Sequence, residues 1–286
     1  MANEVTTAVG SAGELVAAEI VSRLVIDAAY AGAVMPAIVR VADISGDSTL
    51  TVDFPKWPLL SAADLTEGAD AANTAVNTTS TPVAADEAGI MITVTDMLLN
   101  SAGIGGLEPY AMELGKALAN KIDTDLLAEV ADFTNSVGAT GVDMTEANFL
   151  EAIYSLESGN ATGPYAAVLH PVQVHDLRMA LKATTGAVWG GPSAPAGDIG
   201  ALTSLYGVDV FSSTNCALVN TGADRQGVMM PVGNQSGLAY VLKTGAKTEF
   251  QRDASLRATE IVVTAIYGDE CVNPAANGGV KMVTDA

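Results

Sequence analysis

Basic residues are scarce in this sequence of 286 residues. Only 13 Lys and Arg stand against 33 Asp and Glu, which gives a formal net charge of −20. A groove for nucleic acid needs clustered Lys and Arg that displace the counterions of the phosphates. The charge therefore argues against a nucleic-acid-binding protein.

The few bases are unevenly placed, with only Arg23, Arg40 and Lys56 in the first 100 residues. Six others lie in the last 62 residues: Arg225, Lys243, Lys247, Arg252, Arg257 and Lys281. An acidic N-terminal half and a more basic C-terminal segment can attract each other between copies of the chain. The alternative is that the charge serves only solubility.

Cysteines and long apolar runs are also nearly absent. Cys216 and Cys271 are the only cysteines and no CxxC pair exists, so we expect two isolated buried thiols rather than a disulfide framework. No apolar run reaches the roughly 18–20 residues that span a bilayer. The N-terminus lacks the basic-then-apolar layout of a signal peptide. We therefore expect a soluble chain, made in a cytoplasm, with no membrane partner.

Residue patterns for catalysis are missing as well. The only histidines, His170 and His175, do not have a metal-ligand spacing, and no GxSxG, HExxH or GxxxxGK[ST] motif occurs. On a helix, Asp123 and Asp125 point to different faces, so they form no catalytic carboxylate pair. We expect no enzymatic activity, no cofactor and no metal site.

What the sequence does contain is an unusual polar segment, "TEGADAANTAVNTTSTPVAADEAG", from Thr66 to Gly89. It has no base, no aromatic residue and nothing apolar larger than Val, so it cannot build a core of its own. Apolar residues alternate with polar ones on both sides of it, at Leu50–Phe54 and at Ile90–Val94, as in half-buried strands. The pattern predicts a long β-hairpin with these two strands as its arms and the polar segment at its tip.

The strongest helical pattern runs from Leu107 to Phe133, where apolar residues recur at steps of three and four along one face. Shorter patterns predict further helices at 145–158 and 172–182 and strands at 166–169, 208–211, 237–242 and 261–267. A Gly- and Pro-rich loop is expected at Thr184–Gly200. These elements predict an α+β fold.

The order of five segments resembles the major capsid proteins of tailed phages, whose fold is named after phage Hong Kong ninety-seven and is shared with encapsulins. The segments are "VDFPKWPLLSAADLTEGAD", "ITVTDMLLNS", "ELGKALANKIDTDLLAEV", "PYAAVLHPVQVHDLRMAL" and "AIYGDECVNP". The resemblance covers roughly residues 43–283. The helix with Asp123 and Asp125 and the "VLHP" strand-to-helix junction carry it most specifically.

The resemblance implies a division of the chain into five parts. These are an N-terminal arm (1–48), an extended hairpin loop that lies across a neighbouring subunit (49–95), a peripheral domain with a spine helix (96–185), an axial domain (186–262) and a return to the peripheral domain (263–286). The candidates for inter-subunit contact are charged or aromatic residues of the loop and two C-terminal arginines: Lys56, Trp57, Asp64, Glu67, Asp70, Asp86, Glu87, Arg252 and Arg257.

The function that the resemblance implies is that of a major capsid protein, made in the host cytoplasm and located in the virion. Its pentamers and hexamers would form an icosahedral shell around double-stranded DNA that is packaged without sequence-specific binding. The partners implied are a portal protein, a decoration protein and, because only residues 1–48 precede the first hairpin strand, a separate scaffolding protein. One alternative is an encapsulin-type shell that encloses a cargo enzyme. Another is an enzyme that uses the loop Thr184–Gly200 as a lid.

Overall fold

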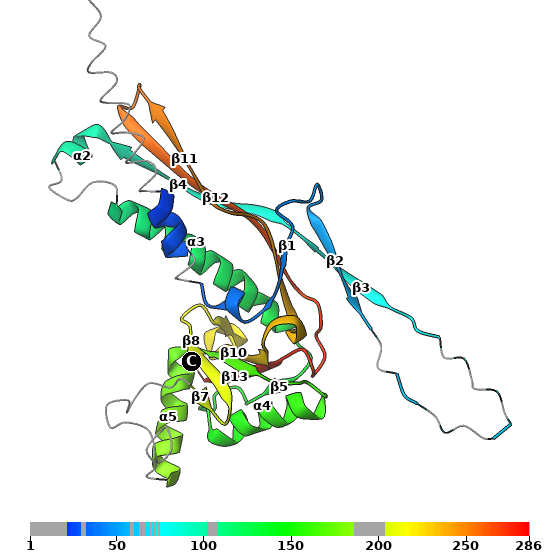
Figure 1. Cartoon of the computed structure of the whole chain (residues 1–286). Coiled ribbons are helices and arrows are strands. Elements are labelled where there is room, and N and C mark those ends of the chain that lie inside the picture. The colour runs from blue at the N-terminus through cyan, green and yellow to red at the C-terminus, as the bar shows by residue number, and fades with distance from the viewer. Residues whose placement is uncertain are drawn as a thin grey trace, which may run out of the picture.

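The fold was analysed in a computed structural model that describes residues 22–29, 33–57, 60–62, 64, 67–68, 70, 73, 75–101, 108–185 and 204–285. Figure 1 shows an elongated molecule in which a body of two sheets and several helices carries a narrow hairpin that projects to one side. Among the described residues, no helix has both the length and the apolar character to cross a membrane.

A four-stranded sheet forms one part of the body. Its order is β1-β11-β12-β4, with β1 parallel to β11 and the other neighbours antiparallel. The strands are β1 (Arg40–Asp43), β11 (Leu238–Asp253), β12 (Ala258–Cys271) and β4 (Asp86–Thr95). Because residues of a strand alternate between the two faces, Val94, Ile261 and Val263 share one face, and they pack into the same core as Leu118 and Ile122 of the long helix.

That helix is α3 (Glu108–Ala128), which continues into the 3-10 helix η2 (Glu129–Asp132), so the predicted helix at 107–133 is confirmed. The helical segment 22–29 crosses α3 at Gly115. A Cβ atom there would lie 2.5 Å from the Val25 carbonyl oxygen, so only glycine permits this close approach.

A seven-stranded sheet forms the other part, in the order β5-β13-β10-β6-β8-β7, with β9 paired to β10. Figure 1 shows α4 (Glu146–Ser158) and α5 (Pro171–Thr185) beside it. Thr145 caps α4, since its hydroxyl accepts a hydrogen bond from the Asn148 amide. The strands are β5 (Ser136–Val137), β6 (Tyr165–Leu169), β7 (Ser204–Leu205), β8 (Val208–Ser212), β9 (Ala217–Val219), β10 (Asp224–Pro231) and β13 (Val280–Asp285).

The projecting hairpin consists of β2 (Thr51–Lys56) and β3 (Thr79–Ala84), paired antiparallel from Thr51 opposite Ala84 to Lys56 opposite Thr79. The sequence prediction was therefore right for the first arm and wrong for the second. The strand expected at Ile90–Val94 exists as β4, but it pairs with β12, because Ile92 and Val94 are covered by the α3 core. Alternation identifies a half-buried strand without identifying its partner.

The sheets group the chain differently from the expected division. Residues 136–169, expected with the long helix, share the seven-stranded sheet with residues 204–231 and 280–285. Residues 238–262, expected with the axial part, belong to the four-stranded sheet. The long strands β11 and β12 cause the difference, because their pairing continues through the expected boundary at residue 262.

The remaining described elements are short: the 3-10 helices η1 (Met35–Ala37), η4 (Asn220–Gly222) and η5 (Gly233–Gln235), and α2 (Asp96–Ser101). The mixture of helices and antiparallel or mixed sheets confirms the α+β class. The loop expected at Thr184–Gly200 lies outside the described residues from residue 186 onward, as does the N-terminal arm before residue 22.

A buried carboxylate joins the N-terminal segment to α3. Asp123 is 2% exposed, and its oxygens accept hydrogen bonds from the backbone amides of Val34 (3.0 Å) and Met35 (2.9 Å). Burial raises the pKa of Asp123, while the two amide donors act in the opposite direction. These donors lie at the start of η1, where the first N–H groups of a helix have no intrahelical acceptor.

We expect Asp123→Ala to lower the free energy of unfolding by about 2–3 kcal/mol, because it leaves buried amide donors without an acceptor. Urea denaturation of the unassembled chain measures this. Glu113→Ala is the matched control on the same helix: Glu113 is exposed and forms a surface ion pair with Lys116, so its loss should change the stability by less than about 0.5 kcal/mol. Equal effects of the two substitutions would show that the carboxylate does not anchor the segment.

Candidate inter-subunit surfaces

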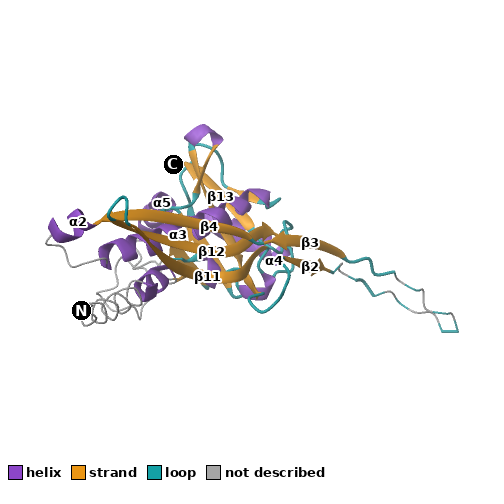
Figure 2. Cartoon of the chain, turned by 90° about the horizontal axis from the view of Figure 1, so that it is seen from above, coloured by secondary structure: helices purple, strands orange, loops and turns teal. Residues whose placement is uncertain are grey.

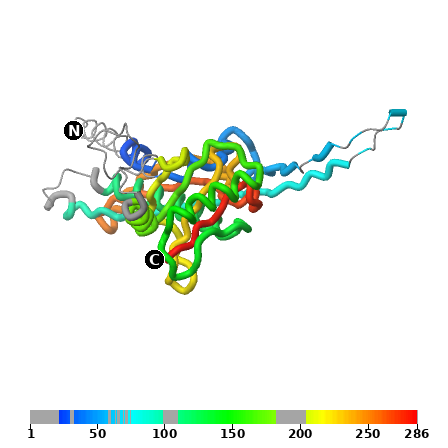
Figure 3. Tube along the Cα trace, turned by 90° about the horizontal axis from the view of Figure 1, so that it is seen from below, coloured from blue at the N-terminus to red at the C-terminus, as the bar shows by residue number. Residues whose placement is uncertain are grey.

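The base of the hairpin is fixed to the body by a small apolar cluster. Phe54 and Val83 are 5% and 1% exposed and pack with Ala239 and Val241 of β11. The described residues of the loop between β2 and β3, residues 57–78, are exposed, with Trp57 at 70% and Leu60 at 56%. Figures 2 and 3 show the loop between β2 and β3 extending away from the body in both views. The base of the hairpin is therefore fixed to the body by apolar packing, whereas the described residues of the loop are exposed to solvent.

The structure separates the predicted contact residues into two ends of the molecule. Asp64, Glu67 and Asp70 are exposed on the projecting loop. Arg252 and Arg257 lie at the turn between β11 and β12, which Figure 1 places at the opposite end. The loop carboxylates and these two arginines are therefore not brought together within one chain.

The other predicted residues lie near the hairpin base and on β4. Lys56 ends β2 and Trp57 follows it, and both are exposed. Asp86 and Glu87 are exposed at the start of β4, opposite Tyr267 and Ile266 of β12. The predicted hairpin would have placed their carboxylates at the loop tip, but the structure places them in the four-stranded sheet.

Arg252 has a partner that sequence reasoning missed. Its guanidinium donates two hydrogen bonds to the carboxylate of Asp96, both of 2.6 Å. This bidentate contact lowers the pKa of Asp96. The residues are 156 positions apart in the chain, and no local pattern links them. The ion pair joins the start of α2 to β11, so Arg252 holds its own chain together at this end.

Five acidic side chains gather where α3 and η2 meet β12. Oxygens of Glu129, Asp132 and Glu270 lie within 4.8 Å of one another, so these three could hold a metal ion by spacing. Acidic groups commonly lie this close without an ion, and spacing alone does not make them a metal site. Nearby, Asp125 accepts a hydrogen bond of 2.7 Å from the Tyr267 hydroxyl and one of 2.6 Å from Lys121.

The fifth carboxyl, Asp269, shows the electrostatic effect of this crowding. The pKa of Asp269 is raised to about 6, mainly by burial and also by the neighbouring Asp125 and Glu270, while Lys121 acts in the opposite direction. Burial also raises the pKa of Glu129, with contributions from Glu270 and Asp269. The charged cluster therefore weakens the fold at neutral pH.

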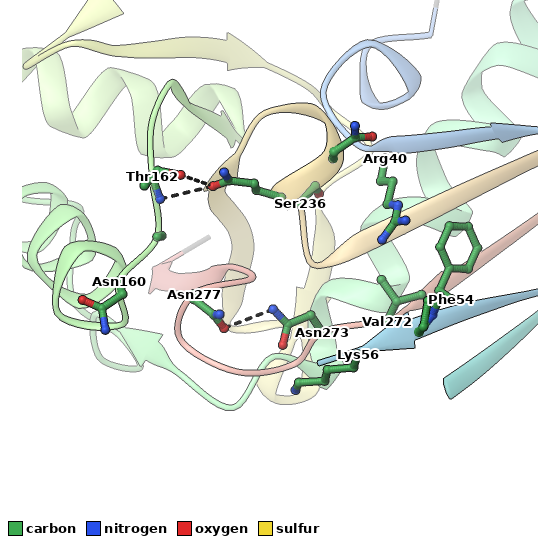
Figure 4. A pocket seen from close by; sticks show the side chains of 13 residues that line it. Arg40, Phe54, Lys56, Asn160, Thr162, Ser236, Val272, Asn273 and Asn277 are labelled. Carbon is green, nitrogen blue, oxygen red and sulfur yellow. Dashed lines mark hydrogen bonds between the residues drawn. The ribbon is translucent and has the colours of Figure 1, made fainter. Parts of the chain in front are cut away.

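A polar hollow of about 280 Å³, shown in Figure 4, lies beside the hairpin base. Arg40 of β1 and Lys56 of β2 line one side, and the Arg40 guanidinium stacks over the Phe54 ring at 4.7 Å. Most of the other lining residues are polar, among them Thr162, whose amide and hydroxyl donate hydrogen bonds to Gln235 Oε1. We call this site the Arg40–Lys56 hollow. Sequence reasoning noted both bases but gave no signal that they share a site.

The cysteines and histidines lie elsewhere. Cys216 and Cys271 are free and buried, as expected, and burial raises the pKa of each thiol to about 12. Both are therefore protonated at neutral pH and poor nucleophiles. His170 accepts a hydrogen bond on Nδ1 from the Val172 amide at the start of α5. Burial lowers the pKa of His170, and the positive charge of Arg225 lowers it to a smaller extent.

Asp269→Asn tests the acidic cluster. A folded-state pKa raised above the ordinary 3.8 means that the native state binds more protons, so this contribution to stability is complete below pH 3.8 and is lost as the pH rises through about 6. Asn does not ionise. We expect the variant to be more stable than the wild type at pH 7 by on the order of 1 kcal/mol, after solvent screening of a half-exposed group, and equally stable at pH 4.

Urea titrations at pH 7 and pH 4 measure the free energy of unfolding of both chains. Taking the difference between the variant and the wild type at each pH removes the effects of pH that are common to both. Glu151→Gln, an exposed change on α4, serves as the control and should show no such pH dependence. A constant difference between wild type and Asp269→Asn at both pH values would contradict the electrostatic origin.

Comparison with known proteins connects this geometry to a family. A family model described as phage capsid protein matches residues 78–276. A search of curated proteins finds no match.

Solved structures with a similar fold include several capsids. The capsid of cyanophage P-SCSP1u has 15% identity and a TM-score of 0.66, over 88% of each chain. A structure from Mycobacterium phage Che8 has 19% identity and a TM-score of 0.62, over 81% of this chain and 84% of that one. A virus-like particle from Pyrococcus furiosus has 13% identity and a TM-score of 0.62, over 92% and 98% of the two chains. At these identities the likeness shows the fold.

Proposed function

The chain belongs to the phage capsid protein family, and from this premise we propose how it builds a shell. Its role is that of a major capsid protein, a structural component of the phage virion with the fold named after phage Hong Kong ninety-seven. The fold alone is shared with a virus-like particle from Pyrococcus furiosus, so it does not separate the phage shell from an encapsulin-type shell. The family match over residues 78–276 favours the phage capsid.

We propose that copies associate head to tail into pentamers and hexamers that close an icosahedral shell. The projecting hairpin is the observation that carries this proposal, because its loop has no core of its own and extends away from the body that anchors it. A contact between two different surfaces of the same chain generates rings when the rotation between copies closes. The four-stranded sheet with α3 would then act as the peripheral domain and the seven-stranded sheet as the axial domain.

The inter-subunit contacts belong to the same proposal. The exposed Trp57 and the loop carboxylates Asp64, Glu67 and Asp70 would contact a neighbour directly. Asp86 and Glu87 would contribute from the exposed edge of β4, and Arg257 from the β11–β12 turn, while Arg252 would act through its ion pair with Asp96. Aromatic and arginine side chains commonly carry much of the energy of such interfaces.

The shell also implies partners. We propose a separate scaffolding protein, a portal protein, a decoration protein and packaged double-stranded DNA held without sequence-specific contacts. The net charge of −20 supports the last point, since a strongly acidic chain does not attract phosphate groups. A structural role without catalysis agrees with the family.

Shortening the loop tests whether it serves the monomer or the assembly. Lys56 and Thr79 are direct partners, so replacing residues 57–78 by Asn-Gly should close the hairpin with a two-residue turn. Since loop closure depends only weakly on length, we expect native-like circular dichroism and unchanged or slightly higher stability. Sedimentation velocity should show that shells no longer form.

The matched control keeps residues 57–78 but replaces three exposed small residues, Ser61, Ala62 and Ala75, by Gly, Ser and Ser. It should assemble like the wild type, because neither length nor charge changes. If the shortened chain still formed shells, the loop would be a passive connection and the head-to-tail proposal would lose its main support.

A further inference from the structure

The Arg40–Lys56 hollow is a positive site in a strongly negative chain. No Asp or Glu is among its lining residues, and within the described part of the chain neither Arg40 nor Lys56 forms an ion pair. Other bases, such as Lys116 and Lys121, do have carboxylate partners in the described residues. Two neighbouring bases without an acid partner favour an anionic ligand, and a carboxylate matches the planar guanidinium of Arg40.

Asn273, one of the residues that line the hollow, has a hydrogen-bond acceptor without a donor among the described residues. Asn273 donates from Nδ2 to Asn277 Oδ1 at 3.0 Å, and its own Oδ1 is buried without a donor in the described structure. Figure 4 shows Asn273 on the same side of the hollow as Lys56. Buried acceptors are normally paired, so this oxygen needs an N–H donor. An acidic peptide supplies both negative charge and N–H groups, whereas a simple inorganic anion supplies only the negative charge.

The chain itself contains such a segment. Its projecting loop carries the exposed Asp64, Glu67 and Asp70, and no Lys or Arg occurs between Trp57 and Gly89. The hairpin directs the loop away from the hollow at its own base, as Figure 1 shows, so the loop can fill only the hollow of another copy. The loop and the hollow are then the two unlike surfaces that a head-to-tail contact requires.

We propose that the Arg40–Lys56 hollow binds the acidic loop segment of a second copy of this chain, with Asp64, Glu67 and Asp70 as the anionic groups. This inference rests on the proposed function, because it names the receptor for the loop in the assembly. Lys56 has a double role: it ends the strand that presents the loop of its own copy and receives the loop of the next copy. Each contact therefore places the base of one hairpin against the loop of another.

Charge reversal with rescue tests the pairing in the full-length chain. Arg40→Glu with Lys56→Glu should reduce the assembled fraction in sedimentation velocity by at least about tenfold, as should Asp64→Lys with Glu67→Lys and Asp70→Lys. Combining all five substitutions in one chain should restore assembly, since every contact then has opposite charges again. Lys116→Glu with Arg178→Glu is the control, because it changes the net charge equally on exposed positions outside the hollow. Circular dichroism verifies the fold of each variant.

A second measurement does not depend on shell formation. A synthetic peptide with the sequence of residues 60–75, LSAADLTEGADAANTA, is titrated into the unassembled wild-type chain. We expect binding that weakens at least about tenfold with Arg40→Glu/Lys56→Glu, or with a peptide in which the three acids are Asn, Gln and Asn.

The two measurements separate the possible failures. Wild-type chains that never form shells but bind the peptide would overturn the proposed function and leave the hollow as a peptide site. Shells that form while the peptide does not bind and the hollow variant still assembles would overturn the inference alone. Failure of the variant with all five substitutions to assemble, although circular dichroism shows it folded, would overturn the pairing of this loop with the hollow.

Discussion

The contact between the Asp123 carboxylate and the backbone amides of Val34 and Met35 determines where the N-terminal segment lies on the body. From η1 the chain continues directly into β1, which pairs in parallel with β11 from Arg40 opposite Ala239 to Asp43 opposite Leu242. In this register the Arg40 guanidinium lies over the Phe54 ring, so β1 contacts the base of the hairpin. A carboxylate in this position is costly because it is dehydrated, and the amide donors offset part of that cost.

The hairpin depends on the same arrangement. Ile44, just after β1, packs with Phe54, Val83 and Val241 in one cluster, so β1, β11 and the two hairpin strands are fixed together. A two-stranded hairpin is only marginally stable alone, and here the body supplies the missing apolar contacts at one end. The direction of the projecting loop is therefore set by packing at its base, where Phe54 and Val83 belong to the cluster, and no residue of the loop itself takes part.

Local pattern predicted much of this fold. The three- and four-residue spacing around Leu114 and Leu118 located α3 because that helix buries one continuous face against the sheet. Alternation located β2 and β4. It missed β3, in which Val83 is the only fully buried side chain and Pro82 and threonines occupy most other positions. In β2, Val52 and Phe54 alternate with polar residues, whereas β3 has no such alternation of large apolar residues and therefore carries no periodic signal.

Partners distant in the sequence could not be predicted. The Arg252–Asp96 ion pair joins β11 to the start of α2, and the Arg40–Lys56 hollow combines residues of β1 and β2 with residues of distant turns, so both form only in the folded chain. Most of the predicted contact residues are charged residues that the sequence placed in or near the loop. The structure places Asp64, Glu67 and Asp70 on the loop. Asp86 and Glu87 instead begin a paired strand, because the hairpin closes earlier in the chain than alternation suggested.

The polar character of the loop, which was the most unusual feature of the sequence, follows from what a shell subunit must do before it assembles. An exposed apolar arm would associate with any other arm, whereas an acidic arm is repelled by every surface of a chain with net charge −20 except a local positive site. Contacts of exposed charges are individually weak and screened by salt, so a wrongly placed copy can dissociate. Many such contacts repeated around a closed ring add up to a stable shell. The scarcity of bases thus contributes to specificity: the fewer positive sites the surface offers, the fewer wrong places there are for the loop to bind.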